Sequence, residues 1–149
     1  MLRFMTDSQR ALAVQMFNGA WDLIDKADRT PDEERQMLTQ AAGSRALWEG
    51  IGGAEQAVTG DWQVAHVAAL LGHASLSLDF ATAAYERAST SDVPTWLVAS
   101  TCEGLARAHA AADHDEEKDA WIARAHALLA EVDDAEDREL IESQIKSIP

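Results

Sequence analysis

The segment from Gly60 to Ala74 constrains the fold of this chain more than any other. Placed on a helix at about 100° per residue, it presents alanines and Gly72 on one side and valines and leucines on the other. The side chains between these two sides are Trp62, Gln63, His66 and His73. A helix that is apolar on two sides must be covered by neighbours on both. The segment therefore predicts a central, buried helix.

The composition favours a single all-α domain spanning residues 1–149. Hydrophobic residues make up 47% and charged residues 26%, as in ordinary globular proteins, and only 8 glycines and 3 prolines interrupt the chain. The single cysteine, Cys102, has no partner for an internal disulfide. The chain lacks a secretory signal and any apolar run near the roughly 20 residues that span a bilayer. We therefore expect a cytoplasmic protein that does not enter membranes.

Acidic residues dominate the charge of the chain, whose net charge is −14. This charge disfavours nucleic acid and anionic membranes as direct partners. Residues 113–149 hold 12 acidic against 4 basic residues, a net −8. We interpret this C-terminal third as a solvated face that keeps the protein soluble, with a docking surface for a basic partner as the alternative.

The spacing of apolar residues predicts seven helices. The first runs from Asp7 or Ser8 to Lys26, the second from Pro31 to the glycines at 50–53, and the third from Gly53 to Gly72. After a turn at Ala74-Ser75, the fourth carries apolar residues from Leu76 to Ala88, and the fifth runs from Pro94 to Asp113. The sixth carries apolar residues from Trp121 to Val132, and the seventh carries Leu140, Ile141, Ile145 and Ile148 on one face. The seventh has the profile of a terminal helix that caps a stack.

Three local signals refine the ends of these helices. Thr30, Pro31 and Glu33 match a capping box, with Thr30 as the N-cap and Pro31 at the first helical position. Ser91 or Asp92 is the expected cap of the fifth helix, with Pro94 near its first position, and Asp133-Asp134 breaks and recaps the chain before the last helix. Gly60, inside the third helix, predicts a kink or a close approach of another backbone.

The helices group into three antiparallel pairs and a C-terminal cap. The pairs start near residues 8, 53 and 93, a period of roughly 40 that is typical of helical repeats. Two segments resemble the first helix of a tetratricopeptide repeat: Leu71-Gly72, and Leu105-Ala106 with His109. Two others are similar to the ends of the second helix: residues 85–88 and 124–128. The resemblance implies a tetratricopeptide-like, right-handed superhelical stack.

Over nearly its whole length the chain also resembles a family of small, uncharacterised tetratricopeptide-like bacterial proteins. The segments that carry this resemblance are residues 20–24, 28–31, 41–45 with Trp48, 60–63 leading to Leu71-Gly72, 103–110 and 137–140. The resemblance implies a fold and no particular activity.

The main candidate binding site is the edge of the third helix that bears Trp62, Gln63, His66 and His73. On the concave surface of a repeat stack, tryptophan and histidine offer stacking area and hydrogen bonds, and Gln63 could bind a backbone amide. Arg45 and Trp48 on the preceding helix could lie nearby. The alternative is that Trp62 belongs to the core and that the histidines bridge helices.

Metal binding and catalysis are both disfavoured by the spacing of the reactive residues. His66 and His73 lie seven residues apart, about 10.5 Å along a helix, and so cannot bind one ion without another segment. Asp113, His114, Asp115 and Glu116 cluster with His109 at a turn, without a recognised zinc spacing. Cys102 lies on an apolar stripe, two helical turns from His109, which is a poor nucleophile–base pair. No cofactor motif is present.

These patterns favour a non-enzymatic helical-repeat adaptor that binds a peptide or protein partner on its concave surface. Its specificity would come from Arg45, Trp48, Trp62, Gln63, His66 and His73. Two alternatives stay open. The first is a small-molecule sensor with a pocket lined by tryptophan and histidine. The second is a homo-oligomeric structural module, because incompletely capped repeats stack readily.

Overall fold

The computed structural model describes residues 2–149, with side chains from residue 6 onward. Within this range the chain forms seven helices and no strand, which confirms the predicted all-α fold. The helices are α1 (Leu2–Ile24), α2 (Pro31–Trp48), α3 (Ala54–Leu70), α4 (Ala74–Thr90), α5 (Thr95–Ala111), α6 (Asp115–Leu129) and α7 (Ala135–Lys146). None of the described helices is long and apolar enough to cross a membrane.

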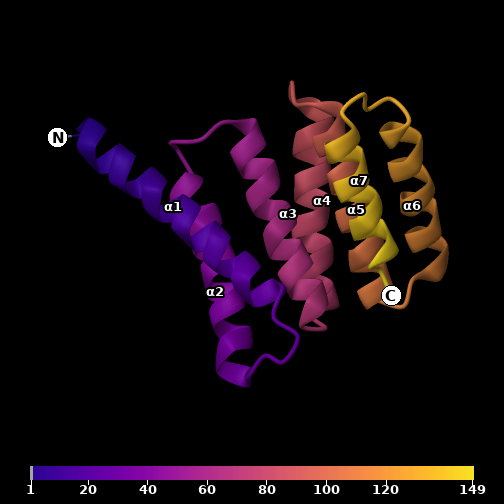
Figure 1. Ribbon diagram of the computed structural model, residues 1–149, viewed down its shortest axis with the longest axis horizontal. Helices are drawn as coiled ribbons and strands as arrows, with labels where there is room; N and C mark the ends of the chain where they lie inside the picture. The colour runs from indigo at the N-terminus through magenta and orange to yellow at the C-terminus, as the bar shows by residue number, and fades with distance from the viewer. Residues whose placement is uncertain (1) are drawn as a thin grey trace.

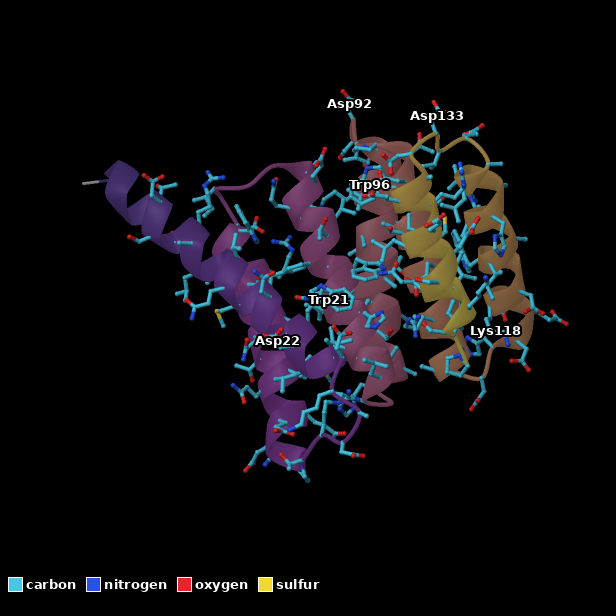
Figure 2. The ribbon with its side chains drawn as sticks, in the orientation of Figure 1. Trp21, Asp22, Asp92, Trp96, Lys118 and Asp133 are labelled. Atoms are coloured by element: carbon cyan, nitrogen blue, oxygen red, sulfur yellow. The ribbon has the colours of Figure 1, made fainter. Side chains whose placement is uncertain are left out.

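Consecutive helices pack against each other as antiparallel pairs (Figure 1). The pairs are α1 with α2, α3 with α4, and α5 with α6, and contacts of α2 with α3 and of α4 with α5 join one pair to the next. The odd-numbered helices also contact one another, α3 with α5 and α5 with α7. They therefore share one face of the stack, an arrangement consistent with a tetratricopeptide-like fold. The N-terminal half of α1 projects away from this stack (Figure 1 and, with side chains, Figure 2).

The predicted capping signals are confirmed at two helix starts. The Thr30 hydroxyl accepts the N–H of Glu33 at 3.2 Å, and the Glu33 carboxylate accepts the N–H of Thr30 at 2.9 Å. Asp134 caps α7 by accepting the N–H of Asp137 at 2.9 Å. These bonds satisfy N–H groups that have no partner inside the helix.

Other helix ends differ from the prediction. At α5 the expected cap by Ser91 or Asp92 is wrong, because Pro94 itself is the N-cap, with an extended backbone at φ −59° and ψ 147°. At α1 the helix begins at Leu2 rather than at Asp7 or Ser8. It ends at Ile24 rather than Lys26, and the Arg29 guanidinium satisfies acceptors at this end by donating to the carbonyl oxygens of Leu23, Ile24 and Lys26. The turn before α4 falls at Leu71–His73 rather than at Ala74-Ser75.

Small residues allow the helices of the core to lie close together. A Cβ atom on Gly60 would lie 2.6 Å from Cδ and 3.4 Å from Cα of Arg45, so α2 and α3 approach closely there, as predicted. Two buried serines join neighbouring helices: the Ser44 hydroxyl donates to the carbonyl of Ala13 at 2.7 Å, and the Ser77 hydroxyl donates to that of Ala65 at 2.8 Å. α3 is accordingly buried on both sides, with Val58, Val64, Ala65, Val67 and Ala68 at most 1% exposed.

Candidate functional site

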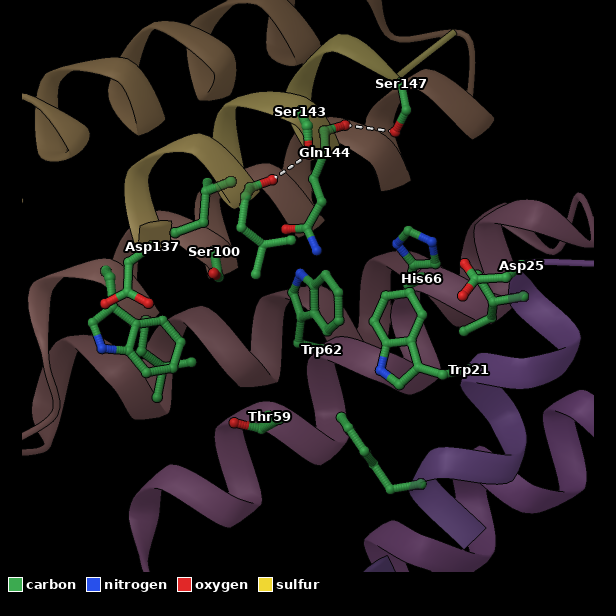
Figure 3. Close-up of a pocket in the computed structure, with 16 residues that line it drawn as sticks. Trp21, Asp25, Thr59, Trp62, His66, Ser100, Asp137, Ser143, Gln144 and Ser147 are labelled. Carbon is green, nitrogen blue, oxygen red and sulfur yellow. Dashed lines mark hydrogen bonds between the residues drawn. The ribbon is translucent and has the colours of Figure 1, made fainter. Parts of the chain in front are cut away.

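The face shared by the odd-numbered helices contains a cavity of about 720 Å³ (Figure 3). This volume lies within the usual range for ligand sites, roughly 300–1,000 Å³. The lining comprises Phe17, Trp21, Ile24 and Asp25 at the end of α1; Thr59, Trp62 and His66 in α3; Trp96, Leu97 and Ser100 in α5; and Asp137, Leu140, Ile141, Ser143, Gln144 and Ser147 in α7 and just after it. Helices from both ends of the sequence therefore build one site.

Three aromatic rings pack together on one wall of the cavity. The ring centres of Trp21 and Trp62 are 5.7 Å apart, those of Trp21 and His66 also 5.7 Å, and those of Trp62 and His66 5.2 Å. Trp62 and His66 lie one turn apart on α3, so both face the same side, and Trp21 of α1 packs against both of them. Tilted rings at such distances attract each other beyond the effect of burial alone.

A buried charged network lies behind this aromatic wall. The Trp62 indole N–H donates to Oε2 of Glu103 at 2.9 Å, and Oε1 of Glu103 accepts Nε of Arg107 at 2.9 Å. Glu103 is 0% exposed and Arg107 4% exposed. Burial raises the pKa of Glu103, and the Arg107 charge and the hydrogen bonds from Arg107 and Trp62 act in the opposite direction. The network ties Trp62 on α3 to α5.

The same arginine fastens α7 over the cavity. Nη2 of Arg107 donates to the carbonyl oxygen of Gln144 at 2.9 Å and to the hydroxyl of Ser147 at 2.7 Å. Gln144 lies in the last turn of α7, and Ser147 is the residue that caps its C-terminal end. The Gln144 side chain points from α7 toward Trp62 (Figure 3). The position of α7, and with it one wall of the cavity, therefore depends on Arg107.

His66 is neutral in this setting and has an unused hydrogen-bonding atom. Burial lowers the pKa of its imidazole to about 3, and the nearby Arg107 charge adds to this effect. The side chain is 6% exposed, and its Nδ1 atom is buried and has no hydrogen-bond partner within the described part of the chain. A buried polar atom in this state costs free energy, which a suitable ligand atom could recover.

Of the four predicted residues on α3 and its end, two line the cavity and two do not. Trp62 and His66 face it from α3. Gln63 is fully buried on another side of α3, where its amide donates to the carbonyl of Phe17 at 3.0 Å and holds α1 in place. His73 is exposed at the N-cap of α4.

The predicted pair on α2 lies outside the cavity. Arg45 pairs with Asp61 on α3 and with Glu49, each at 2.7 Å. Trp48 lies beneath the guanidinium of Arg10, whose Cζ atom is 5.5 Å from the ring centre. Trp48 does line two smaller hollows of about 220 and 280 Å³. The first of these shares Phe17 and Thr59 with the main cavity, so the hollowed surface continues along α1 and α3.

The residues considered for metal binding and catalysis lie elsewhere. His109 and His114 bring their Nδ1 atoms within 3.1 Å, but the described residues contain no group of three or more potential ligands placed to hold a metal ion. Burial raises the pKa of the Cys102 thiol to about 11, and its side chain is 0% exposed. A buried thiol of high pKa is a poor nucleophile.

From the sequence we predicted neither the buried network of Trp62, Glu103 and Arg107 nor the contribution of α1 and α7 to the cavity. Trp21 reads as one more apolar residue of an amphipathic helix. Glu103 and Arg107 offered a usable signal, because they stand four residues apart within a run of small and apolar residues, where a charged pair must be buried. Gln144 and Ser147 carry no such signal, since polar residues are ordinary at the end of a helix.

Comparisons with protein-family models, with curated proteins and with solved structures found no match for this chain. Its place in the tetratricopeptide-like family therefore remains a prediction from the quoted segments.

Proposed function

We propose that this protein is a non-enzymatic adaptor that binds a peptide segment of another protein on the face formed by α1, α3, α5 and α7. One observation carries this proposal. The main cavity and the hollow beside it share Phe17 and Thr59, so the concave surface extends beyond what a compact small molecule would need. An extended peptide could place one side chain in the cavity and run along α1 and α3.

Exposed apolar side chains at the groove support the same proposal. Leu140 at the edge of the cavity is 57% exposed, although it belongs to the apolar face of the last helix. Val14, in the neighbouring hollow, is 44% exposed. Large apolar side chains left in water along one groove are typical of binding surfaces.

The cytoplasmic location and the homo-oligomeric alternative remain predictions.

A small-molecule sensor is the second candidate, and the cavity itself favours it. Its volume of about 720 Å³, its wall of Trp21, Trp62 and His66, and the unpartnered Nδ1 of His66 would suit a heterocyclic ligand. Such a ligand would raise the melting temperature of the protein by mass action. A ligand of this kind would occupy the main cavity alone and leave empty the smaller hollow beyond Thr59, between α1 and α3.

Selection from a random peptide library against the purified protein tests the adaptor. Binding of the enriched peptides is then measured by the fluorescence of the cavity tryptophans. The Thr59→Tyr variant, which fills the shared part of the groove without adding charge, should weaken binding by at least about tenfold. Thr39→Tyr, on the exposed side of α2, is the matched control and should bind as wild type does.

Three results distinguish the candidates. Enriched peptides that bind wild type and Thr39→Tyr but not Thr59→Tyr would support the adaptor. Peptides that bind all three proteins equally would place the peptide surface elsewhere and overturn the site. If no peptide is enriched and a metabolite screen raises the melting temperature of wild type, the sensor replaces the adaptor.

A further inference from the structure

The charged side chains at the cavity are all acidic. Asp25, after the end of α1, and Asp137, on α7, belong to its lining, and among the described residues no lysine or arginine does. Neither carboxylate takes part in an ion pair within the described residues. Figure 3 shows them at opposite ends of the cavity, with Trp62 and Trp21 between them. Two unpaired anions thus flank an aromatic surface.

The aromatic surface itself suits a positive charge. Trp21, Trp62 and Trp96 all line the cavity, and the negative face of an indole attracts ammonium and guanidinium groups. Trp62 donates its N–H to Glu103, and this bond to a carboxylate increases the electron density of the ring. Arg107, a cation behind this wall, is 4% exposed and paired with Glu103.

The unpartnered nitrogen of His66 gives a second, independent indication. His66 is 6% exposed and lines the cavity, and its buried Nδ1 has no hydrogen-bond partner among the described residues. Nδ1 accepts in the tautomer that carries hydrogen on Nε2 and donates in the other, so it indicates a polar ligand atom and not the charge of the ligand. The two carboxylates only accept, and ammonium and guanidinium groups carry donors only, so the carboxylates favour a cation over an anion or a carbonyl compound.

We propose that the cavity between α1, α3, α5 and α7 binds the cationic side chain of a lysine or arginine in the bound peptide. This inference rests on the proposed function and specifies the chemistry of its partner. The cationic head lies against the indoles of Trp21 and Trp62, and Asp25 or Asp137 pairs with it. The net charge of −14 steers a basic segment toward the protein, and the cavity selects where it binds.

Two kinds of measurement test whether the cavity binds a cationic side chain. Each enriched peptide is resynthesised with lysine replaced by norleucine and arginine by citrulline, which keeps the length and removes the charge. In parallel, Nα-acetyl-arginine amide and Nα-acetyl-lysine amide are titrated into the protein and followed by tryptophan fluorescence. Loss of charge should raise the Kd of the peptide by at least about tenfold, and at least one amide should bind with a Kd in the millimolar range.

A charge-matched pair of variants separates the cavity from general attraction to an acidic protein. Asp25→Asn/Asp137→Asn removes the two cavity carboxylates. Asp119→Asn/Glu131→Gln removes two exposed carboxylates, one on α6 and one just after it, and neither lines the cavity. Because both proteins lose the same charge, only the first should raise the Kd of the peptide and of the amides by about tenfold.

The outcomes separate this inference from the proposed function. Enriched peptides that depend on Thr59 but bind equally well without their charges would overturn the cationic site and leave the adaptor standing. Equal weakening by the two charge variants would also overturn it, because the attraction would then be non-specific. If no peptide is enriched but an amide binds and depends on Asp25 and Asp137, the cationic site stands and the adaptor falls. If neither peptide nor amide binds, both fail.

Discussion

Trp62 and Glu103 are joined by a buried hydrogen bond of 2.9 Å that links α3 to α5 behind the cavity. The same carboxylate pairs with Arg107, so removing it leaves a buried cation without its partner. We expect Glu103→Gln to lower the free energy of unfolding by about 3–5 kcal/mol, although glutamine can still accept the indole N–H. Urea unfolding followed by circular dichroism measures this loss.

Removing both charges should cost less than the two single changes added together. The double variant Glu103→Gln/Arg107→Met leaves no unpaired buried charge. Its loss of unfolding free energy should therefore be about 1–3 kcal/mol smaller than the sum of the losses in the two single variants. The cycle includes Arg107→Met as the other single variant. Strict additivity would show that the two side chains do not stabilise each other.

Gly104 makes room for the indole of Trp62, and we expect Gly104→Ala to disturb it. A Cβ atom at this position would lie 2.9 Å from Cδ1 and 3.3 Å from Nε1 of Trp62. Alanine normally stabilises a helix interior by about 1 kcal/mol over glycine, but here the ring must move, so we expect a net loss of about 1–3 kcal/mol. A shifted tryptophan emission maximum should accompany the loss.

Gly43→Ala is the matched control for this change. Its Cβ atom would meet only the flexible end of Met16, at 2.4 Å from Cε, and that side chain can rotate away. Gly43→Ala should therefore be neutral or stabilising, with unchanged emission. A stabilised Gly104→Ala protein with wild-type emission would contradict the close packing of Trp62 on α5.

Much of the fold follows from short-range signals in the sequence. The capping box at Thr30 and the cap at Asp134 act within four residues, so the sequence alone specifies them. The double apolar face of the segment around Val64 and Ala65 likewise required neighbours on both sides, and these two residues, one from each side, are both 1% exposed. The end of α1 lacks such a local signal, since its last carbonyl oxygens accept hydrogen bonds from the side chain of Arg29, several residues further along.

The candidate site was predictable only where it lies on one helix. Trp62 and His66 follow from the periodicity of α3, which places them one turn apart. Periodicity alone does not say which polar residue of α3 faces a cavity, so Gln63, which binds the carbonyl of Phe17, was grouped with them. Trp21 and Gln144 join the site from helices near the two ends of the chain. Only the tertiary packing of α1 and α7 brings them there.

The Cys102 thiol should be unreactive in the native protein. Burial raises its pKa to about 11, and only the thiolate attacks disulfide reagents. At pH 8 we expect 5,5′-dithiobis-(2-nitrobenzoic acid) to react at least about 100-fold more slowly with the native protein than with the protein in 8 M urea. Absorbance at 412 nm follows the reaction. Comparable rates in both states would show that α5 opens often or that the thiol is accessible.

His66 should make the protein less stable as the pH falls below neutrality. Burial lowers the pKa of its imidazole from 6.5 to about 3 in the folded state. Between these values the unfolded chain binds a proton that the folded protein does not, so stability is full above pH 6.5 and falls steadily toward pH 3. At pH 5 this single group should cost about 2 kcal/mol relative to pH 7.5.

Urea unfolding at pH 7.5 and pH 5.0 measures the contribution of His66 by difference. His66→Gln keeps a polar side chain of similar reach but cannot be protonated, so its loss of stability between the two pH values should be smaller than that of wild type by about 2 kcal/mol. His73→Gln is the control, because His73 is exposed and solvated in both states. An equal loss in wild type and His66→Gln would mean that the imidazole takes up its proton in the folded protein. It would then be no neutral acceptor for a ligand in the cavity.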